Sequence, residues 1–90
     1  MRVFIEFAWS VAEKVGRKYL WLNLDYEELS LDDVFKKILP SILGESLGVV
    51  IYRLIQEREL LVIVNGVIGD LTIKLKDGDK ILIQPLASGG

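Results

Sequence analysis

The stretch ELLVIVNGVI, residues 59–68, decides how this chain is expected to fold. Its first part, Glu59 to Val64, is an apolar run with the length and β-branched content typical of a buried strand. Asn65-Gly66 follows at once, and this dipeptide favours the tight turn of a two-residue hairpin. Val67-Ile68 can then pair back briefly along the strand. The stretch therefore predicts a short hairpin in the last third of a chain of 90 residues.

A further strand is expected downstream, over Lys80 to Gln84. The segment LKDGDK at residues 75–80 has the Asp and Gly content of a turn that leads into it. Pro85 lacks a backbone N–H group and should close the strand. Residues 86–90, LASGG, carry no pattern and are expected to form a flexible tail. We therefore expect one domain over residues 1–85, followed by the tail at 86–90.

The N-terminal part predicts a first hairpin. Apolar side chains alternate in residues 2–8 and again in Tyr19 to Leu24, which indicates two strands. The connection from Trp9 to Lys18 is polar and contains Gly16. Because parallel strands need a longer crossover, we interpret this connection as a loose hairpin loop. Trp9 and Trp21 lie in or beside strands, so we expect their rings to pack rather than to stack on a ligand.

A helix is expected between the two hairpins. Ser30 and Asp33 have the spacing of a capping box, which marks the start of a helix. The buried face should be formed by four apolar side chains, Val34, Phe35, Ile38 and Leu39. Pro40 should end this helix at or near Leu39. Helical spacing favours a second short helix at about 45–57. The order of elements predicts an α+β fold, a mixed sheet of about 4–5 strands with one or two helices packed on one face.

Composition excludes several kinds of chemistry. The chain has no Cys and no His, so it lacks thiol nucleophiles, thiolate metal sites and the commonest general base. The acid pairs Glu27–Glu28, Asp32–Asp33 and Asp77–Asp79 suit a loop, a helix start and a turn, and we expect no metal site. The net charge of −2 does not favour nucleic acid or an anionic membrane as partner. Charges interrupt every apolar run, and Glu6 falls inside any N-terminal signal segment, so we expect a cytoplasmic protein.

Three motifs, taken in order, resemble the ubiquitin-like sulfur carriers of prokaryotes. They are Val64-Asn65-Gly66, the LKDGDK turn at residues 75–80, and the end from Pro85 to Ser88-Gly89-Gly90. Phe7-Ala8 after the first strand is also similar to the family. The likeness is greatest to the small subunit of molybdopterin synthase (MoaD-like), then to the thiamine-pathway carrier (ThiS-like). This resemblance implies a ubiquitin-like β-grasp fold.

The resemblance also implies a mechanism. A ubiquitin-activating-type enzyme would use ATP to adenylate the carboxylate of Gly90, and a sulfur donor protein would convert it to a thiocarboxylate. The tail residues Leu86, Ala87, Ser88 and Gly89 would then insert into the molybdopterin synthase large subunit. The chain would be a carrier rather than an enzyme, with no bound cofactor and with ATP used only by its activating enzyme.

Two matters stay open on the sequence. The same fold and tail would also suit a ubiquitin-like protein modifier, or a carrier for tRNA thiolation or thiamine synthesis. A non-covalent interaction module with an incidental tail is a third reading. The partner surface implied by the family includes Phe7, Ile68 and Gln84. For Phe7, its neighbour Glu6 argues for an inward side chain, whereas the resemblance argues for an outward one.

Overall fold

The computed structural model describes residues 1–86. Five strands and a set of helices lie in it in the order β1 (Arg2–Phe7), α1 (Ser10–Val15), β2 (Tyr19–Asn23), α2 (Leu31–Asp33), η1 (Val34–Ile38), α3 (Leu39–Leu43), α4 (Glu45–Gln56), β3 (Leu60–Val64), β4 (Val67–Ile68) and β5 (Lys80–Pro85). The segments α2, η1 and α3 follow one another without a break, and η1 is a π-helical stretch. Both expected hairpins and both expected helices are present.

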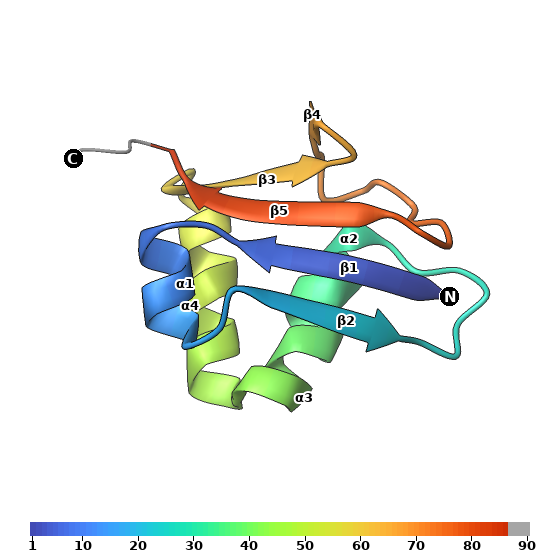
Figure 1. The fold of residues 1–90 in the computed structure, drawn as a ribbon, viewed down its shortest axis with the longest axis horizontal. Coiled ribbons are helices and arrows are strands. Elements are labelled where there is room, and N and C mark those ends of the chain that lie inside the picture. The colour runs from blue at the N-terminus through green and yellow to red at the C-terminus, as the bar shows by residue number, and fades with distance from the viewer. Residues whose placement is uncertain (87–90) are drawn as a thin grey trace.

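The five strands form one mixed sheet in the order β2-β1-β5-β3-β4. The first and last strands pair in parallel at its centre, with Ile5 beside Ile81 and Phe7 beside Ile83. All other pairs are antiparallel. The helices cover one face of this sheet, and Figure 1 shows the other face open. The mixed sheet with helices on one face is the ubiquitin-like β-grasp arrangement, so the expected fold class is confirmed.

The core lies between the sheet and the helices. Its largest fully buried side chains are Phe35, Ile5, Leu31, Leu39, Ile51, Ile81 and Ile83. Alternation along β1 sends Val3, Ile5 and Phe7 inward. Phe7 is only 2% exposed, so its expected place on a partner surface is wrong. Glu6 next to it is exposed, and because neighbouring strand residues face opposite ways, it turns Phe7 into the core.

The connection between β1 and β2 was expected to be a loose polar loop, but it contains the helix α1. Val11, Ala12 and Val15 have helical spacing, and Val11 is buried against the core. Gly16 ends the helix with φ 85°, a left-handed angle that glycine adopts without strain. The antiparallel pairing of β1 with β2 is as expected, but the loop between them is an ordered turn of helix.

Pro40 does not end the first long helix, contrary to expectation. The helical run continues to Leu43, because the hydrogen bonding changes just before the proline. The Leu39 N–H donates to the carbonyl of Val34, five residues back. Pro40 is the second residue of α3 and lies in its first turn, where a missing N–H is tolerated. Ser41 Oγ donates to the carbonyl of Ile38 at 2.7 Å and satisfies a group near the proline.

Helix α4 packs closely on α3 through a glycine. Gly48 is buried, and a Cβ atom placed on it would lie 2.8 Å from the Cα of Pro40. Only a residue without a side chain permits this approach, although glycine in a helix interior costs about 1 kcal/mol relative to alanine. The close packing of two helices therefore explains a residue that helix propensity alone disfavours.

Candidate functional site

Strands β1 and β5 finish at the same end of the sheet (Figure 1), and the described chain ends just beyond β5, at Leu86. The Ala8 N–H donates to the carbonyl of Ile83 at 3.0 Å, which ties the end of β1 to β5. On the other side, Pro85 lies opposite Leu60. The Leu86 N–H donates to the carbonyl of Glu59 at 3.1 Å. The chain is therefore held by backbone hydrogen bonds on two neighbouring strands up to Leu86.

The reactive and inserting residues expected from the sequence lie beyond this point. Ala87, Ser88, Gly89 and Gly90 are outside the described residues, so the structure does not test their expected roles or the expected tail. Leu86 is described, and its side chain is 58% exposed. The structure thus describes the base of the expected site.

The remaining residues of the expected partner surface lie on different parts of the sheet. Ile68 on β4 is exposed, and Gln84 on β5 is half-buried. Both point away from the core. Gln84 follows the buried Ile83 along β5, and Ile68 pairs with Ile63, which lies between the buried Val62 and Val64 on β3 and so faces the opposite way. Phe7 lies in the core on the covered face and does not join them. The accessibility of Ile68 and Gln84 is compatible with a partner surface, whose role stays a prediction.

An aromatic cluster on the open face was not singled out by the sequence analysis. The ring of Phe4 lies 4.6 Å from that of Trp21 and 5.9 Å from that of Tyr19, between centroids. The Arg2 guanidinium lies 5.5 Å from the Trp21 ring, and the Lys80 ammonium 5.9 Å from the Phe4 ring. Alternation along β2 was the available signal, because it places Tyr19 and Trp21 on the face opposite Leu22. Trp21 does pack on a neighbour, although it remains 63% exposed.

A groove of about 850 Å³ runs beside Leu86, between the end of α4 and strand β3. Its walls include the apolar side chains Ile55, Leu60, Leu71 and Leu86, together with the polar Arg58. Strand β4 pairs with β3 only at Ile63 and Val64, so the first part of β3 borders this groove. The groove begins where the described chain ends at Leu86.

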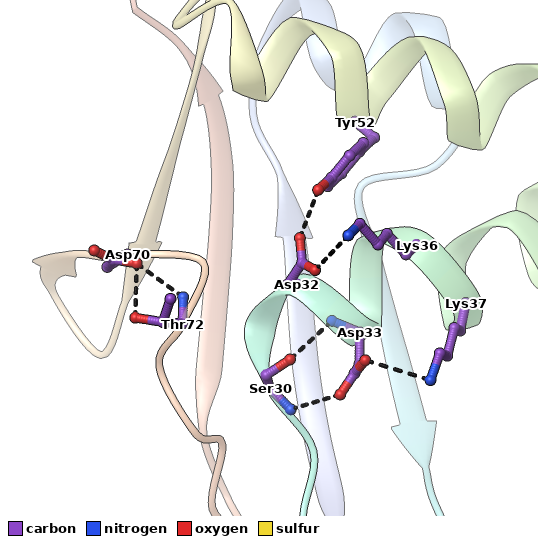
Figure 2. A network of polar contacts seen from close by, with 8 residues as sticks. All are labelled: Ser30, Asp32, Asp33, Lys36, Lys37, Tyr52, Asp70 and Thr72. Carbon is purple, nitrogen blue, oxygen red and sulfur yellow. Dashed lines mark hydrogen bonds and ion pairs between the residues drawn. The ribbon is translucent and has the colours of Figure 1, made fainter.

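Most of the carboxylates have structural partners. Figure 2 shows that Tyr52 on α4 points toward Asp32 on α2. The Tyr52 hydroxyl donates to Asp32 Oδ1 at 2.6 Å, and Lys36 Nζ lies 2.9 Å from Asp32 Oδ2. The Tyr52 hydrogen bond is the main reason why the pKa of Asp32 is below its ordinary value, with Lys36 acting in the same direction. The same hydrogen bond raises the pKa of Tyr52, and Asp32 raises that of Lys36.

Three further aspartates cap a helix or a turn. Asp33 and Ser30 exchange hydrogen bonds in the expected capping box (Figure 2), and the Ser30 N–H lowers the pKa of Asp33. Asp70 accepts from the backbone and hydroxyl of Thr72, which lowers its pKa. Asp79 accepts from Lys76 N–H and from the Asn65 amide, and so joins the two turns of the C-terminal half. In residues 1–86 no group of three or more carboxylates gathers into a metal-binding arrangement.

No helix among the described residues has the length and apolar character needed to cross a lipid bilayer. The longest, α4, has 12 residues and carries charged side chains at Glu45 and Arg53.

Comparison with known proteins found likenesses at the level of structure. No family model matches the chain, and no curated protein does either. SAMP1 (small archaeal modifier protein 1) from Haloferax volcanii superposes with TM-score 0.72 at 16% identity, covering 100% of both chains. The putative molybdopterin converting factor subunit 1 from Pyrococcus furiosus gives 0.70 at 18% identity, covering 94% of this chain and 97% of that one. A chain from the complex of subunits 1 and 2 of the molybdopterin-converting factor from Helicobacter pylori 26695 gives 0.55 at 21% identity, covering 100% of both.

These likenesses span the whole described domain. At identities of 16–21% they establish the fold, which is that of MoaD-like and SAMP-like ubiquitin-like proteins. The superpositions cover at least 94% of each of the compared chains. A shared fold does not by itself fix a shared function.

Proposed function

We propose that this protein is a sulfur carrier whose Gly90 carboxylate is adenylated and converted to a thiocarboxylate. The observation that carries the proposal is the end of β5. This strand is central in the β-grasp sheet, and the chain that leaves it is fixed at the end of the sheet, where the Leu86 N–H donates to the carbonyl of Glu59. The sequence then continues with Ala87-Ser88-Gly89-Gly90. Glycines without side chains suit passage through a narrow channel into another protein's active site.

The chemistry follows from the weakness of a carboxylate as an electrophile. An oxygen of the Gly90 carboxylate attacks the α-phosphorus of ATP and pyrophosphate leaves, which gives an acyl-adenylate. A sulfide sulfur then attacks the carbonyl carbon, and AMP leaves with the electrons of the broken C–O bond. The product is a thiocarboxylate, a sulfur nucleophile formed without any cysteine in the carrier. An activating enzyme supplies the ATP site, and a sulfur donor protein supplies the sulfur.

We further propose that the acceptor is a pterin precursor in molybdopterin synthesis, with the chain acting as the small, non-catalytic subunit. Two neighbours support this acceptor, because one is a molybdopterin converting factor subunit 1 and another belongs to a complex of subunits 1 and 2. A large catalytic subunit would take residues 86–90 into its active site. The exposed Leu86 and Ile68, with the half-buried Gln84, would contact it.

Covalent modification of other proteins is the second candidate function. The likeness to SAMP1, a small archaeal modifier protein, favours it. In that case a lysine amine, instead of sulfide, would displace AMP from the Gly90 acyl-adenylate: its nitrogen would attack the carbonyl carbon, AMP would leave with the electrons of the broken C–O bond, the amine would lose a proton, and an isopeptide bond would result. The two functions share the activation step and differ in the nucleophile that follows.

Intact-mass measurement tests the first function. The protein is incubated with ATP, its activating enzyme and sulfide, and the expected result is the mass increase of one sulfur-for-oxygen exchange. A variant that lacks Gly90 is the matched control, and it should melt at the wild-type temperature but gain no sulfur. An unchanged wild-type mass, beside a known carrier that reacts, would contradict the proposal.

Peptide mapping separates the second function from the first. Trypsin cleaves after Lys80, so a conjugated protein would carry residues 81–90 on a lysine side chain. Finding this remnant on cellular proteins would favour modification, whereas finding only free thiocarboxylate would favour sulfur transfer.

A further inference from the structure

Trp9 occupies a backbone position that normally requires glycine. Between β1 and α1 the chain turns over residues 8–11, and the Val11 N–H donates to the carbonyl of Ala8 at 3.0 Å. Trp9 is the second residue of this turn, with φ 49° and ψ −122°. These angles are those of the first central position of a type II′ turn, where glycine is the favoured residue. The sequence therefore places its largest type of side chain where the turn has least room for one.

This conformation is held by neighbouring groups, the buried Val11 and the hydrogen bond from Ala8 to Ile83, rather than by the Trp9 ring. The Trp9 side chain is 62% exposed, so most of its surface makes no contact within the described fold. Within residues 1–86 its ring stacks on no other aromatic ring and has no cation above it, unlike that of Trp21. Elsewhere in the described residues, positive φ falls at four glycines, as at Gly16, and at the polar residues Asn65 and Arg58, so Trp9 is the one apolar residue with such an angle. A strained bulky residue that does not serve the fold suggests selection for a contact outside it.

The position of Trp9 relates this contact to the C-terminus. Phe7 of β1 pairs in parallel with Ile83 of β5. Trp9, two residues after Phe7, therefore lies at the same end of the sheet as Pro85, the last residue of β5. Both lie at the edge where the described chain leaves the sheet. From Leu86, the residues 87–90 can extend by at most about 14 Å. An enzyme whose active site receives the Gly90 carboxylate must therefore approach this end of the sheet, at which Trp9 also lies.

We propose that Trp9 is an anchor for the adenylating enzyme, and that its indole inserts into an apolar pocket on that enzyme beside the channel for the tail. This inference rests on the proposed function, since it takes Gly90 to be the adenylated residue. Tryptophan is the residue most enriched among those that dominate binding energy at interfaces. The backbone strain has a use on this account, because it turns the indole outward from the rigid end of β1. The neighbouring Glu13 and Lys14 are both exposed and offset each other in charge, so the apolar ring carries the contact.

The test is the variant Trp9→Gly, which removes the ring and gives the turn the residue it favours. Its melting temperature should equal or exceed that of the wild type. The dissociation constant for the activating enzyme, measured by calorimetry without ATP, should rise roughly 10- to 100-fold, as expected when a central anchor is lost. In ATP–pyrophosphate exchange the KM for the carrier should rise similarly, with kcat little changed.

Two further variants serve as controls. Tyr26→Gly removes an exposed aromatic ring from the loop after β2, at the opposite edge of the sheet, and should leave the dissociation constant unchanged. Trp9→Phe keeps an apolar ring in the same turn and should recover part of the affinity. Equal binding by Trp9→Gly and wild type would overturn the anchor, as would a loss of binding that only accompanies a lower melting temperature.

The same measurements separate the two proposals. If the wild type binds through Trp9 but exchanges no pyrophosphate, the anchor stands and adenylation of Gly90 fails. If the wild type is adenylated and Trp9→Gly is adenylated equally well, the anchor alone fails. If the wild type does not bind its activating enzyme, both proposals fail.

Discussion

Two helical segments of this protein begin in opposite ways. At α2, Ser30 accepts from the Asp33 N–H while the Asp33 carboxylate accepts from the Ser30 N–H. The next two backbone N–H groups, of Leu31 and Asp32, donate to the carbonyls of Ile73 and Leu71. At α1, by contrast, the residue before the helix is Trp9, with a positive φ and no side-chain cap.

The difference shows which interactions stabilise each helix start, those within a few residues or those with distant parts of the chain. The start of α2 agrees with local sequence rules and is reinforced by a loop from the other end of the chain. The start of α1 goes against local rules and is held by neighbours, through the buried Val11 and the hydrogen bond from Ala8 to Ile83. Consistent local choices stabilise a fold, and inconsistent ones mark sites under another constraint.

The largest expected effect is that of Leu31→Ala. The side chain of Leu31 is fully buried at the first position of α2, so its removal leaves a cavity under the capped helix start. We expect the free energy of unfolding to fall by about 2–5 kcal/mol in chemical denaturation. An exposed counterpart, Leu86→Ala, is the control and should change it little. A small loss for Leu31→Ala would mean that the start of α2 is not a firmly packed element.

A smaller loss is expected for Ser30→Ala. This change removes the acceptor of the Asp33 N–H but keeps the Ser30 backbone donor, so half of the capping box remains. The free energy of unfolding should fall by about 1 kcal/mol. Ser46→Ala, which removes an exposed hydroxyl from α4, measures the effect of losing a serine that is not a cap. Equal stability of Ser30→Ala and wild type would contradict the conclusion that α2, unlike α1, is stabilised by a side-chain cap.

The sign should reverse at the other helix start. Relief of the turn strain by Trp9→Gly is offset in part by the greater backbone freedom of glycine in the unfolded chain. We expect a net gain of about 0.5–1 kcal/mol, measured in the same denaturation experiment. Trp9→Ala lacks the ring but keeps a Cβ atom, and should gain less. A destabilised Trp9→Gly would show that the indole supports the fold.

The smallest effect is a pH dependence at the α2 start. The folded-state pKa of Asp32 lies below its ordinary value, chiefly because Tyr52 donates to it. Its stabilising contribution is therefore fully present above the ordinary aspartate pKa of 3.8 and is lost as the pH falls through the lowered folded value. The stability difference between wild type and Tyr52→Phe should shrink over this acidic range. The exposed Tyr26→Phe should give no such change, and a difference constant down to strongly acidic pH would contradict the assignment.

Most of the fold could be predicted from the sequence because its signals are local. Strict alternation marked β1 and β2, the Asn65-Gly66 turn marked the β3–β4 hairpin, and Ser30 with Asp33 marked the start of α2. The failures occurred where packing overrode local rules. Pro40 continues a helix because a π-helical turn precedes it, and α1 forms in a polar connection because Val11 reaches the core.

The candidate site was predictable to a lesser degree. The sequence directed attention to the C-terminal end, and the structure placed Leu86 at a sheet edge beside a groove. It also removed Phe7 from the partner surface and placed Trp9 next to the tail base. Neither position follows from residue type, since an apolar residue at a strand end fits a core and an interface equally well.

By itself, the sequence determined the strands, the capped helix and the lack of thiol and imidazole chemistry, because periodicity, caps and composition act within a few residues. The tertiary structure alone decided which ends of the strands meet. Parallel pairing of β1 with β5 brings Trp9 and Pro85, far apart in the chain, to one edge. Contacts of that kind depend on the closure of long loops around a shared core, and no short window of sequence contains both partners.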